Sequence, residues 1–220
     1  IKRELKKYKA AYYLETAMGI YDILDNNLDV RNIIARATLA AKQCKGQYMI
    51  HEARYTEELR AKIIREQNII NEMEHALETG EFVVYFQPKY STKKKRLYGA
   101  EALVRWKSSK LGSISPGEFI PVLERSSNII ELDEYVFVIT CKQIRKWLDD
   151  GLEVAPIAVN VSQLHLYRQD FVESYLKVID AYQIPYNLIE LEMTETSLFD
   201  NRDIFCLLYT SPSPRDVEES

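Results

Sequence analysis

The alternation of apolar and polar residues is clearest over residues 97–106, where it predicts a half-buried β-strand. Successive side chains of a strand point to opposite faces, so Glu101, Leu103 and Arg105 share one face. The residues between them, together with Trp106, form an apolar face that is expected to pack on helices. The first face must instead hold a carboxylate and a guanidinium in a fairly dry place.

Alternating strand and helix signals occupy the rest of the chain beyond residue 80. Apolar runs predict further strands at 82–87, 155–161 and 188–194, and the first is expected to pair with 97–106 across a solvated basic hairpin that contains Lys89. Such repetition is typical of parallel strands in a barrel or a doubly wound sheet. The apolar periodicity predicts helices at 55–79, 115–125, 132–150 and 170–182.

Several residues indicate where these helices begin and end. Ser115 is the expected N-cap of the second helix, and Pro116 and Glu118 would complete its first turn and a capping box. Gly80 and Gly151 are expected to end the first and third helices. The apolar stripe of the 55–79 helix leaves two interpretations open: a signalling or dimer-forming helix, or a helix that packs on its own domain.

The N-terminal region reads as a shorter unit. Its pattern predicts a strand at 16–21, a turn at 25–27 and an amphipathic helix at 30–45 that ends near Gly46.

Composition excludes several classes of protein. The chain has 220 residues, of which 46% are hydrophobic and 28% charged, as in a soluble globular protein. Its net charge of -4 argues against nucleic-acid binding, and no apolar run approaches the roughly 20 residues of a membrane span. The three cysteines are far apart in the sequence, which favours a reducing, cytoplasmic location over a disulfide framework or a zinc site.

The two charges of the 97–106 strand indicate a ligand site. Glu101 and Arg105 lie four residues apart, a span of about 13 Å in a strand, so they cannot neutralise each other directly. Each needs an external partner, such as a cation for the carboxylate and a phosphate for the guanidinium. This is the outline of a metal-assisted phosphoester site, although Arg105 could also pair with a structural carboxylate.

Five motifs in order resemble the EAL family, the cyclic di-GMP-specific phosphodiesterases. The resemblance covers roughly residues 65–200 and implies a modified TIM barrel, of which this chain holds the first half. The motifs are FQP at 86–88, EALVRW at 101–106, SPGEFIP at 115–121, NVS at 160–162 and LEMTE at 191–195.

Site residues follow from the resemblance, position by position. In such barrels the chemistry gathers at the C-terminal ends of the strands. The resemblance implies that Glu101, Asn160 and Glu192 are the first three metal ligands, and an all-oxygen set suits Mg²⁺ or Mn²⁺. Taken singly, Glu192 could be a solvated strand residue and Asn160 a satisfied core amide.

The same resemblance assigns a substrate pocket and a reaction. Arg105 would hold a phosphate oxygen, and Gln87 and Leu103 would line the nucleotide pocket. The metal would activate a water that attacks phosphorus, which converts cyclic di-GMP to pGpG. The alternative is a degenerate EAL domain that binds cyclic di-GMP or a protein partner without turnover.

The N-terminal region is similar to the last strand and helix of a GGDEF (diguanylate cyclase) domain. The GGDEF motif itself is absent, so cyclase activity is not expected. The parent would be a bacterial GGDEF-EAL signalling protein, with a homodimer as one hypothesis for its assembly. The predicted organisation is a GGDEF-like remnant at 1–54, a linker helix at 55–80, half an EAL domain at 81–200 and a non-family tail at 201–220.

The chain departs from the family pattern after Asp200. The paired-aspartate DDFG motif and the general-base lysine have no counterpart, and the aspartates at 149–150 instead end a predicted helix. The tail resembles translated adapter sequence and is expected to be disordered. The chain alone is therefore predicted to be inactive and to expose an unpaired strand edge, and a fragment without function is the third hypothesis. Lys107 stands where many relatives have His, at a position expected to lie in a loop.

Overall fold

The computed structural model describes residues 17–23, 28–44, 52–93 and 95–193. The chain divides into two compact units, residues 1–67 and 68–220. Among the described residues, no helix combines the length and the apolar character that crossing a bilayer requires. The predicted turn at 25–27, the stop at Gly46 and the tail at 201–220 lie outside the described residues.

The first unit contains a strand-helix-strand motif. Strand β1 (Met18–Ile20) pairs in parallel with β2 (Glu52–Arg54), and helix α2 (Val30–Cys44) packs on both strands. Gly19 lets β1 approach this helix, since a Cβ there would lie 1.8 Å from the carbonyl oxygen of Ala37. The predicted strand and helix are confirmed, whereas β2 was not predicted, because two of its three residues are charged and no apolar run marks it.

Helix α3 (Glu57–Thr79) joins the two units. Its C-terminal half belongs to the second unit, where Ile69, Met73 and Ala76 are buried in the core. This half of the helix therefore packs on its own domain, which is the second of the two interpretations that the sequence left open. Gly80 follows with φ of 72°, the left-handed conformation that ends the helix.

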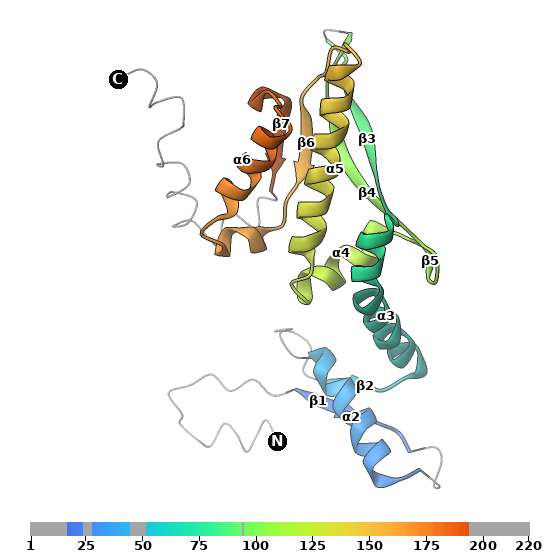
Figure 1. Cartoon of the computed structure of the whole chain (residues 1–220). Coiled ribbons are helices and arrows are strands. Elements are labelled where there is room, and N and C mark those ends of the chain that lie inside the picture. Colours follow the sequence, from blue (N-terminus) through green and yellow to red (C-terminus); the bar gives the residue numbers. More distant parts are fainter. Residues whose placement is uncertain (1–16, 24–27, 45–51, 94, 194–220) are drawn as a thin grey trace. The chain divides into compact units, whose positions relative to one another are not determined.

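A five-stranded mixed sheet forms the second unit (Figure 1). The hairpin of β3 and β4 is antiparallel, β4 and β6 are parallel, and so are β6 and β7. The order is β3-β4-β6-β7, with β5 paired antiparallel to β4. The strands are β3 (Phe82–Ser91), β4 (Arg96–Ser108), β5 (Gly112–Ile114), β6 (Ile157–Asn160) and β7 (Ile189–Glu192).

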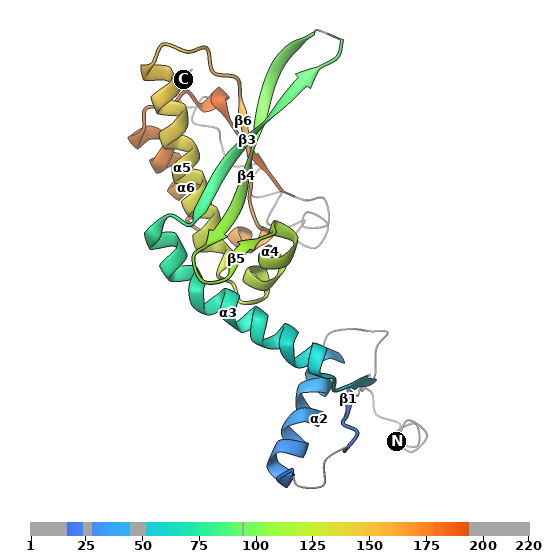
Figure 2. The same ribbon diagram turned by 90° about the vertical axis from the view of Figure 1, so that its right-hand side faces the viewer.

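Helices cover one face of this sheet (Figures 1 and 2). Helix α5 packs against β3, β4 and β6, while α4 packs on β4 and α6 on α5. Trp106 is fully buried under these helices, with its ring centroid 4.7 Å from that of Phe82 and 5.7 Å from that of Phe119. The helices are α4 (Pro116–Arg125), α5 (Ile129–Asp149) and α6 (Phe171–Ala181), with short 3-10 turns η1 (Gln163–Tyr167) and η2 (Tyr186–Leu188).

These observations confirm the predicted α/β class and the alternation of β4, in which Ala102 and Trp106 face the helices. Two local expectations are wrong. Ser115 is the N-cap of α4 and Pro116 begins the helix, as predicted, but the expected capping box is not formed, since the Ser115 side chain makes no capping bond to any described residue. Lys107 lies within β4 rather than in a loop, because pairing with β5 extends the strand to Ser108.

Candidate metal and phosphate site

Three oxygen-bearing side chains come from three successive parallel strands. Glu101 lies on β4, Asn160 ends β6 and Glu192 ends β7. Asn160 and Glu192 are directly paired across β6 and β7, and Glu101 is paired with Ala158, two residues before Asn160. Because side chains two residues apart in a strand share a face, all three point to the face of the sheet opposite the helices.

Glu101 and Asn160 touch each other. The Asn160 Nδ2 donates a hydrogen bond to Glu101 Oε1 at 2.7 Å, across 59 positions of sequence. Asn160 is exposed and Glu101 is half-buried. Asn160 is therefore not a buried core amide, and the fairly dry environment expected for this face is not observed among the described residues.

Backbone and side-chain bonds hold the end of β6 in place. The backbone N–H of Val161 donates to the carbonyl of Glu192 at 2.9 Å, which continues the β6–β7 ladder past Asn160. The backbone N–H of Ser162 donates to Asp133 Oδ2 on α5 at 2.8 Å. The same oxygen lies 3.3 Å from Nε2 of the buried His165, and burial raises the pKa of the Asp133 carboxyl.

Glu192 has a partner that the sequence did not suggest. Lys89 Nζ lies 2.6 Å from Glu192 Oε1, and the Lys89 side chain is only 26% exposed. The hydrogen bond to Glu192 raises the pKa of Lys89, and the charges of Glu101 and Glu190 act in the same direction. Lys89 is therefore not part of a solvated hairpin. Its place two residues after Gln87, on the same face of the strand, was the available signal.

The chemistry of these donors fits a hard divalent cation. Oε1 of Glu192 accepts the bond from Lys89, and Oε1 of Glu101 accepts the bond from Asn160. Neither bond occupies Oε2 of these carboxylates or Oδ1 of Asn160. Three oxygens of this kind suit Mg²⁺ or Mn²⁺. No three His, Cys, Asp or Glu residues gather into a metal-binding group in the described part of the chain.

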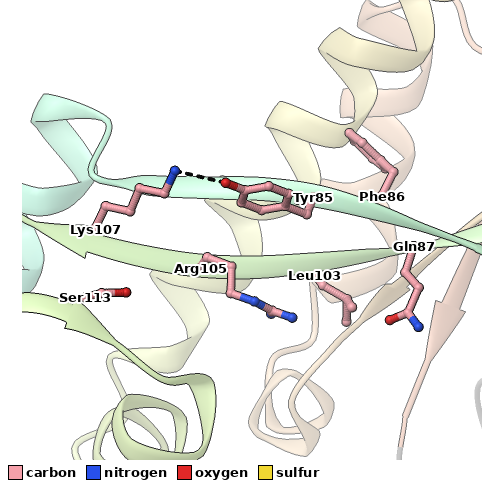
Figure 3. A pocket seen from close by; sticks show the side chains of 7 residues that line it. All are labelled: Tyr85, Phe86, Gln87, Leu103, Arg105, Lys107 and Ser113. Atoms are coloured by element: carbon pink, nitrogen blue, oxygen red, sulfur yellow. Dashed lines mark hydrogen bonds between the residues drawn. The ribbon is translucent and has the colours of Figure 1, made fainter.

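A cleft of about 400 Å³ lies along the β3–β4 hairpin and contains the predicted pocket residues. Gln87, Leu103 and Arg105 point to the same side of the hairpin, and Phe86 points away from them (Figure 3). The residues lining the cleft are Tyr85, Phe86, Gln87, Leu103, Arg105, Lys107 and Ser113.

Two cations line this cleft. Arg105 NH1 donates a hydrogen bond to the carbonyl of Val104, in the same strand, at 2.8 Å. Among the described residues, no carboxylate forms a hydrogen bond or ion pair with its guanidinium. Lys107 Nζ donates to the Tyr85 hydroxyl at 2.9 Å (Figure 3). A half-buried guanidinium beside an ammonium favours an anionic ligand such as a phosphate. Lys107 and Tyr85 were not predicted as lining residues.

Sequence comparison identifies bacterial relatives of this chain. The signaling protein YkoW of Bacillus subtilis is 35% identical over 129 residues, which are 59% of this chain and 16% of that protein. The cyclic di-GMP phosphodiesterase PdeR of Escherichia coli is 29% identical over 196 residues, 87% of this chain and 29% of that protein. The chain thus spans less than a third of the length of these relatives.

Solved structures share the fold. The PaMucR phosphodiesterase in complex with c-di-GMP superposes with a TM-score of 0.59 at 31% identity, over 64% of this chain and 59% of that chain. The EAL enzyme Bd1971 in its cGMP-bound form gives a TM-score of 0.59 at 24% identity, over 83% and 48% of the two chains, which shows the fold alone. Residues 70–206 match the EAL domain, and the chain therefore belongs to the EAL family.

Proposed function

We propose that this chain carries the metal- and phosphate-binding part of a cyclic di-GMP phosphodiesterase. The full-length parent would hydrolyse cyclic di-GMP to pGpG with Mg²⁺ or Mn²⁺. The observation that carries the proposal is the meeting of Glu101, Asn160 and Glu192 on one face of three parallel strands, next to a cleft with a guanidinium. Relatives named cyclic di-GMP phosphodiesterases support the choice of substrate.

Each residue would have a distinct role. Glu101, Asn160 and Glu192 would hold the divalent ion through their remaining oxygens. When bound, such an ion lowers the pKa of a coordinated water and offsets charge on a phosphodiester. Arg105 would donate to a phosphate oxygen, and Gln87 and Leu103 would position the nucleotide against the hairpin.

For the chain taken by itself, we propose binding without turnover. Its sequence contains no DDFG segment, and no lysine in it matches the family's general base. The first three proposed metal ligands and the proposed phosphate ligand Arg105 are nevertheless present. A degenerate EAL domain that serves as a cyclic di-GMP-binding module is the second candidate, and it predicts the same binding for this chain.

Binding and hydrolysis by the purified chain test these proposals. We expect cyclic di-GMP to bind in the presence of Mn²⁺, measured by isothermal titration, and no pGpG to appear by chromatography. Arg105→Met should weaken binding by about tenfold or more, because a charge-assisted bond to a phosphate is lost. Arg145→Met is the matched control, since Arg145 pairs with Asp149 on α5 and lines no part of the cleft.

The outcomes separate the candidates. Equal cyclic di-GMP affinity in the Arg105→Met and Arg145→Met variants would contradict the assignment of the cleft. Metal-dependent pGpG formation would contradict the proposed inactivity and would support catalysis by the parent. In a chain extended with the parent's own downstream sequence, turnover that Glu101→Ala abolishes would exclude the binding-module candidate.

The remaining features of the parent are also proposals. Residues 1–54 would be the end of a GGDEF-like domain, consistent with the β1-α2-β2 arrangement of the first unit. Residues 55–80 would link it to the EAL domain, and dimerisation of the parent through this helix and a cytoplasmic location are expected. Size-exclusion chromatography with light scattering on the parent tests the dimer.

A further inference from the structure

Lys89 occupies a position that the proposed reaction does not explain. It is paired with Gly99 across the β3–β4 hairpin, and a β-bulge follows it directly. The aliphatic part of its side chain lies over this glycine, since Lys89 Cδ is 4.0 Å from the place of a Cβ on Gly99. The ammonium group reaches Glu192 on β7, 103 positions away in sequence.

The charges on this face explain why an ammonium group is stable there. Glu101, Glu190 and Glu192 are on the same face of β4 and β7, because Glu101 and Glu190 are both paired with Ala158. All three carboxylates raise the pKa of Lys89, so each is close enough for its charge to act on the ammonium group. Without a cation these carboxylates would repel one another.

Lys89 and a divalent ion would use the same carboxylate. The ammonium holds Glu192 Oε1, while the oxygens assigned to the metal are Oε2 of Glu192, Oε2 of Glu101 and Oδ1 of Asn160. An ion bound to Glu192 would therefore lie within a few ångströms of the ammonium nitrogen. At that separation the repulsion between a unit charge and a double charge is large even where water screens it.

We propose that Lys89 is a resident cation of the metal site: it neutralises Glu192 when no metal is bound, and a divalent ion binds in competition with it. The inference rests on the proposed metal site and adds a residue that sets its affinity. Lys89 thus stabilises the metal-free chain and weakens metal binding. A lysine with a purely structural role would have the opposite effect on the metal, because its loss would disorder Glu192 and lower the affinity.

Mn²⁺ binding to the 220-residue chain tests the sign of this effect. Free Mn²⁺ is measured by electron paramagnetic resonance during a titration at neutral pH, without nucleotide. Lys89→Met should bind Mn²⁺ about tenfold more tightly than the unmutated 220-residue chain, because the competing charge is gone. Lys89→Arg keeps the charge and should bind Mn²⁺ as the unmutated chain does. Lys177→Met is the matched control, because Lys177 also forms an ion pair, with Glu173 at 2.8 Å on the outer helix α6.

A second variant keeps the test decisive if Lys89→Met does not fold. Lys89→Gln is neutral but can still donate a hydrogen bond to Glu192, so it should also bind Mn²⁺ more tightly. Thermal unfolding gives an independent readout. Without metal, the neutral variants should have a lower melting temperature than the unmutated chain, and saturating Mn²⁺ should remove most of that difference. Unchanged or weaker Mn²⁺ binding in the neutral variants would overturn the proposal.

Glu101→Ala distinguishes this failure from failure of the proposed function. If Glu101→Ala and the unmutated 220-residue chain bind Mn²⁺ equally, the assignment of the metal site is wrong, whatever the role of Lys89. If Glu101→Ala loses binding and the neutral Lys89 variants show no gain, the metal site stands and the role of Lys89 is wrong.

Discussion

Glu81 shows how one carboxylate can fix the start of a hairpin. Its Oε1 accepts bonds from the Ser109 hydroxyl at 2.6 Å and from the Ser109 backbone N–H at 3.0 Å. Its Oε2 accepts a bond from the Trp106 indole N–H at 3.1 Å. The Ser109 hydroxyl bond is the largest cause that lowers the pKa of Glu81 to about 2.

The lowered pKa predicts an acid-dependent contribution to stability. Because the folded-state pKa lies below the ordinary value of 4.5, the contribution is present above pH 4.5 and is lost as the pH falls toward 2. Glu81→Ala should lower the free energy of unfolding by about 1 kcal/mol at neutral pH, a modest amount because solvent screens the group. The difference in free energy of unfolding between Glu81→Ala and the unmutated chain should shrink below pH 4.5.

Denaturant unfolding of both chains across this pH range checks the prediction. Glu153→Ala removes an exposed carboxylate beyond α5 and should leave stability nearly unchanged. A Glu81→Ala effect that stays constant down to the lowest pH would show that packing, rather than charge, is responsible.

At this scale the sequence predicted the faces of a strand better than the extent of the strand. The alternation placed Glu101 and Arg105 on the face opposite Trp106, as observed. The sequence was wrong on Lys89, because a basic cluster near a turn usually indicates a solvated hairpin, and on Lys107, because the strand was expected to end at Trp106. Here a distant carboxylate and a tyrosine hydroxyl stabilise those charges within strands, and such partners are not visible in local sequence.

Among the elements, the junction of β4 and β6 depends on a close approach. A Cβ on Gly99 would lie 2.9 Å from the carbonyl oxygen of Pro156. The same oxygen accepts a hydrogen bond from the backbone N–H of Ala100 at 2.9 Å. The two strands can therefore pair at this point only because residue 99 has no side chain.

Gly99→Ala is expected to destabilise the chain by about 1–3 kcal/mol, because the added methyl group presses on backbone rather than on a movable side chain. Thermal or denaturant unfolding measures the change. The matched control is Gly117→Ala in the first turn of α4, where an added Cβ meets nothing within 4 Å. This control should be neutral or slightly stabilising, and equal losses in both variants would refute the role of Gly99.

The bounds of the long elements were predictable, whereas two of the short strands were missed. Helix α5 was expected at 132–150 and spans Ile129–Asp149, because its apolar stripe repeats over many turns. Strands β2 and β5 have three residues each, too few for a period, and depend on pairing with distant strands. Ser115 is the N-cap of α4, as its motif predicts, but its side chain makes no capping hydrogen bond among the described residues, which the motif alone does not reveal.

In the molecule as a whole, a divalent ion should stabilise one unit and not the other. All three proposed ligands belong to the second unit, residues 68–220. At a free Mn²⁺ concentration of about 100 times its dissociation constant, binding adds about 2.7 kcal/mol to the stability of the state that binds it. The first unit, which contains α2, includes none of the three proposed ligands.

Hydrogen exchange detected by mass spectrometry separates the two units. With Mn²⁺ in place of a chelator, exchange should slow in peptides that cover 157–160 and 189–192, and it should not change in peptides that cover 30–44. Glu101→Ala should remove the metal effect. Equal protection in all peptides would mean that Mn²⁺ acts on the chain non-specifically.

The wide sequence separation of the ligands also bears on the order of events during synthesis. The β3–β4 hairpin can close as soon as Ser108 has left the ribosome, because its contacts are local. Glu101 and Lys89 are then already in place, but Glu192 is translated 91 residues after Glu101 (192 minus 101). A nascent chain would thus complete the proposed cation site only when β7 pairs with β6, and we expect no divalent ion to be held there earlier.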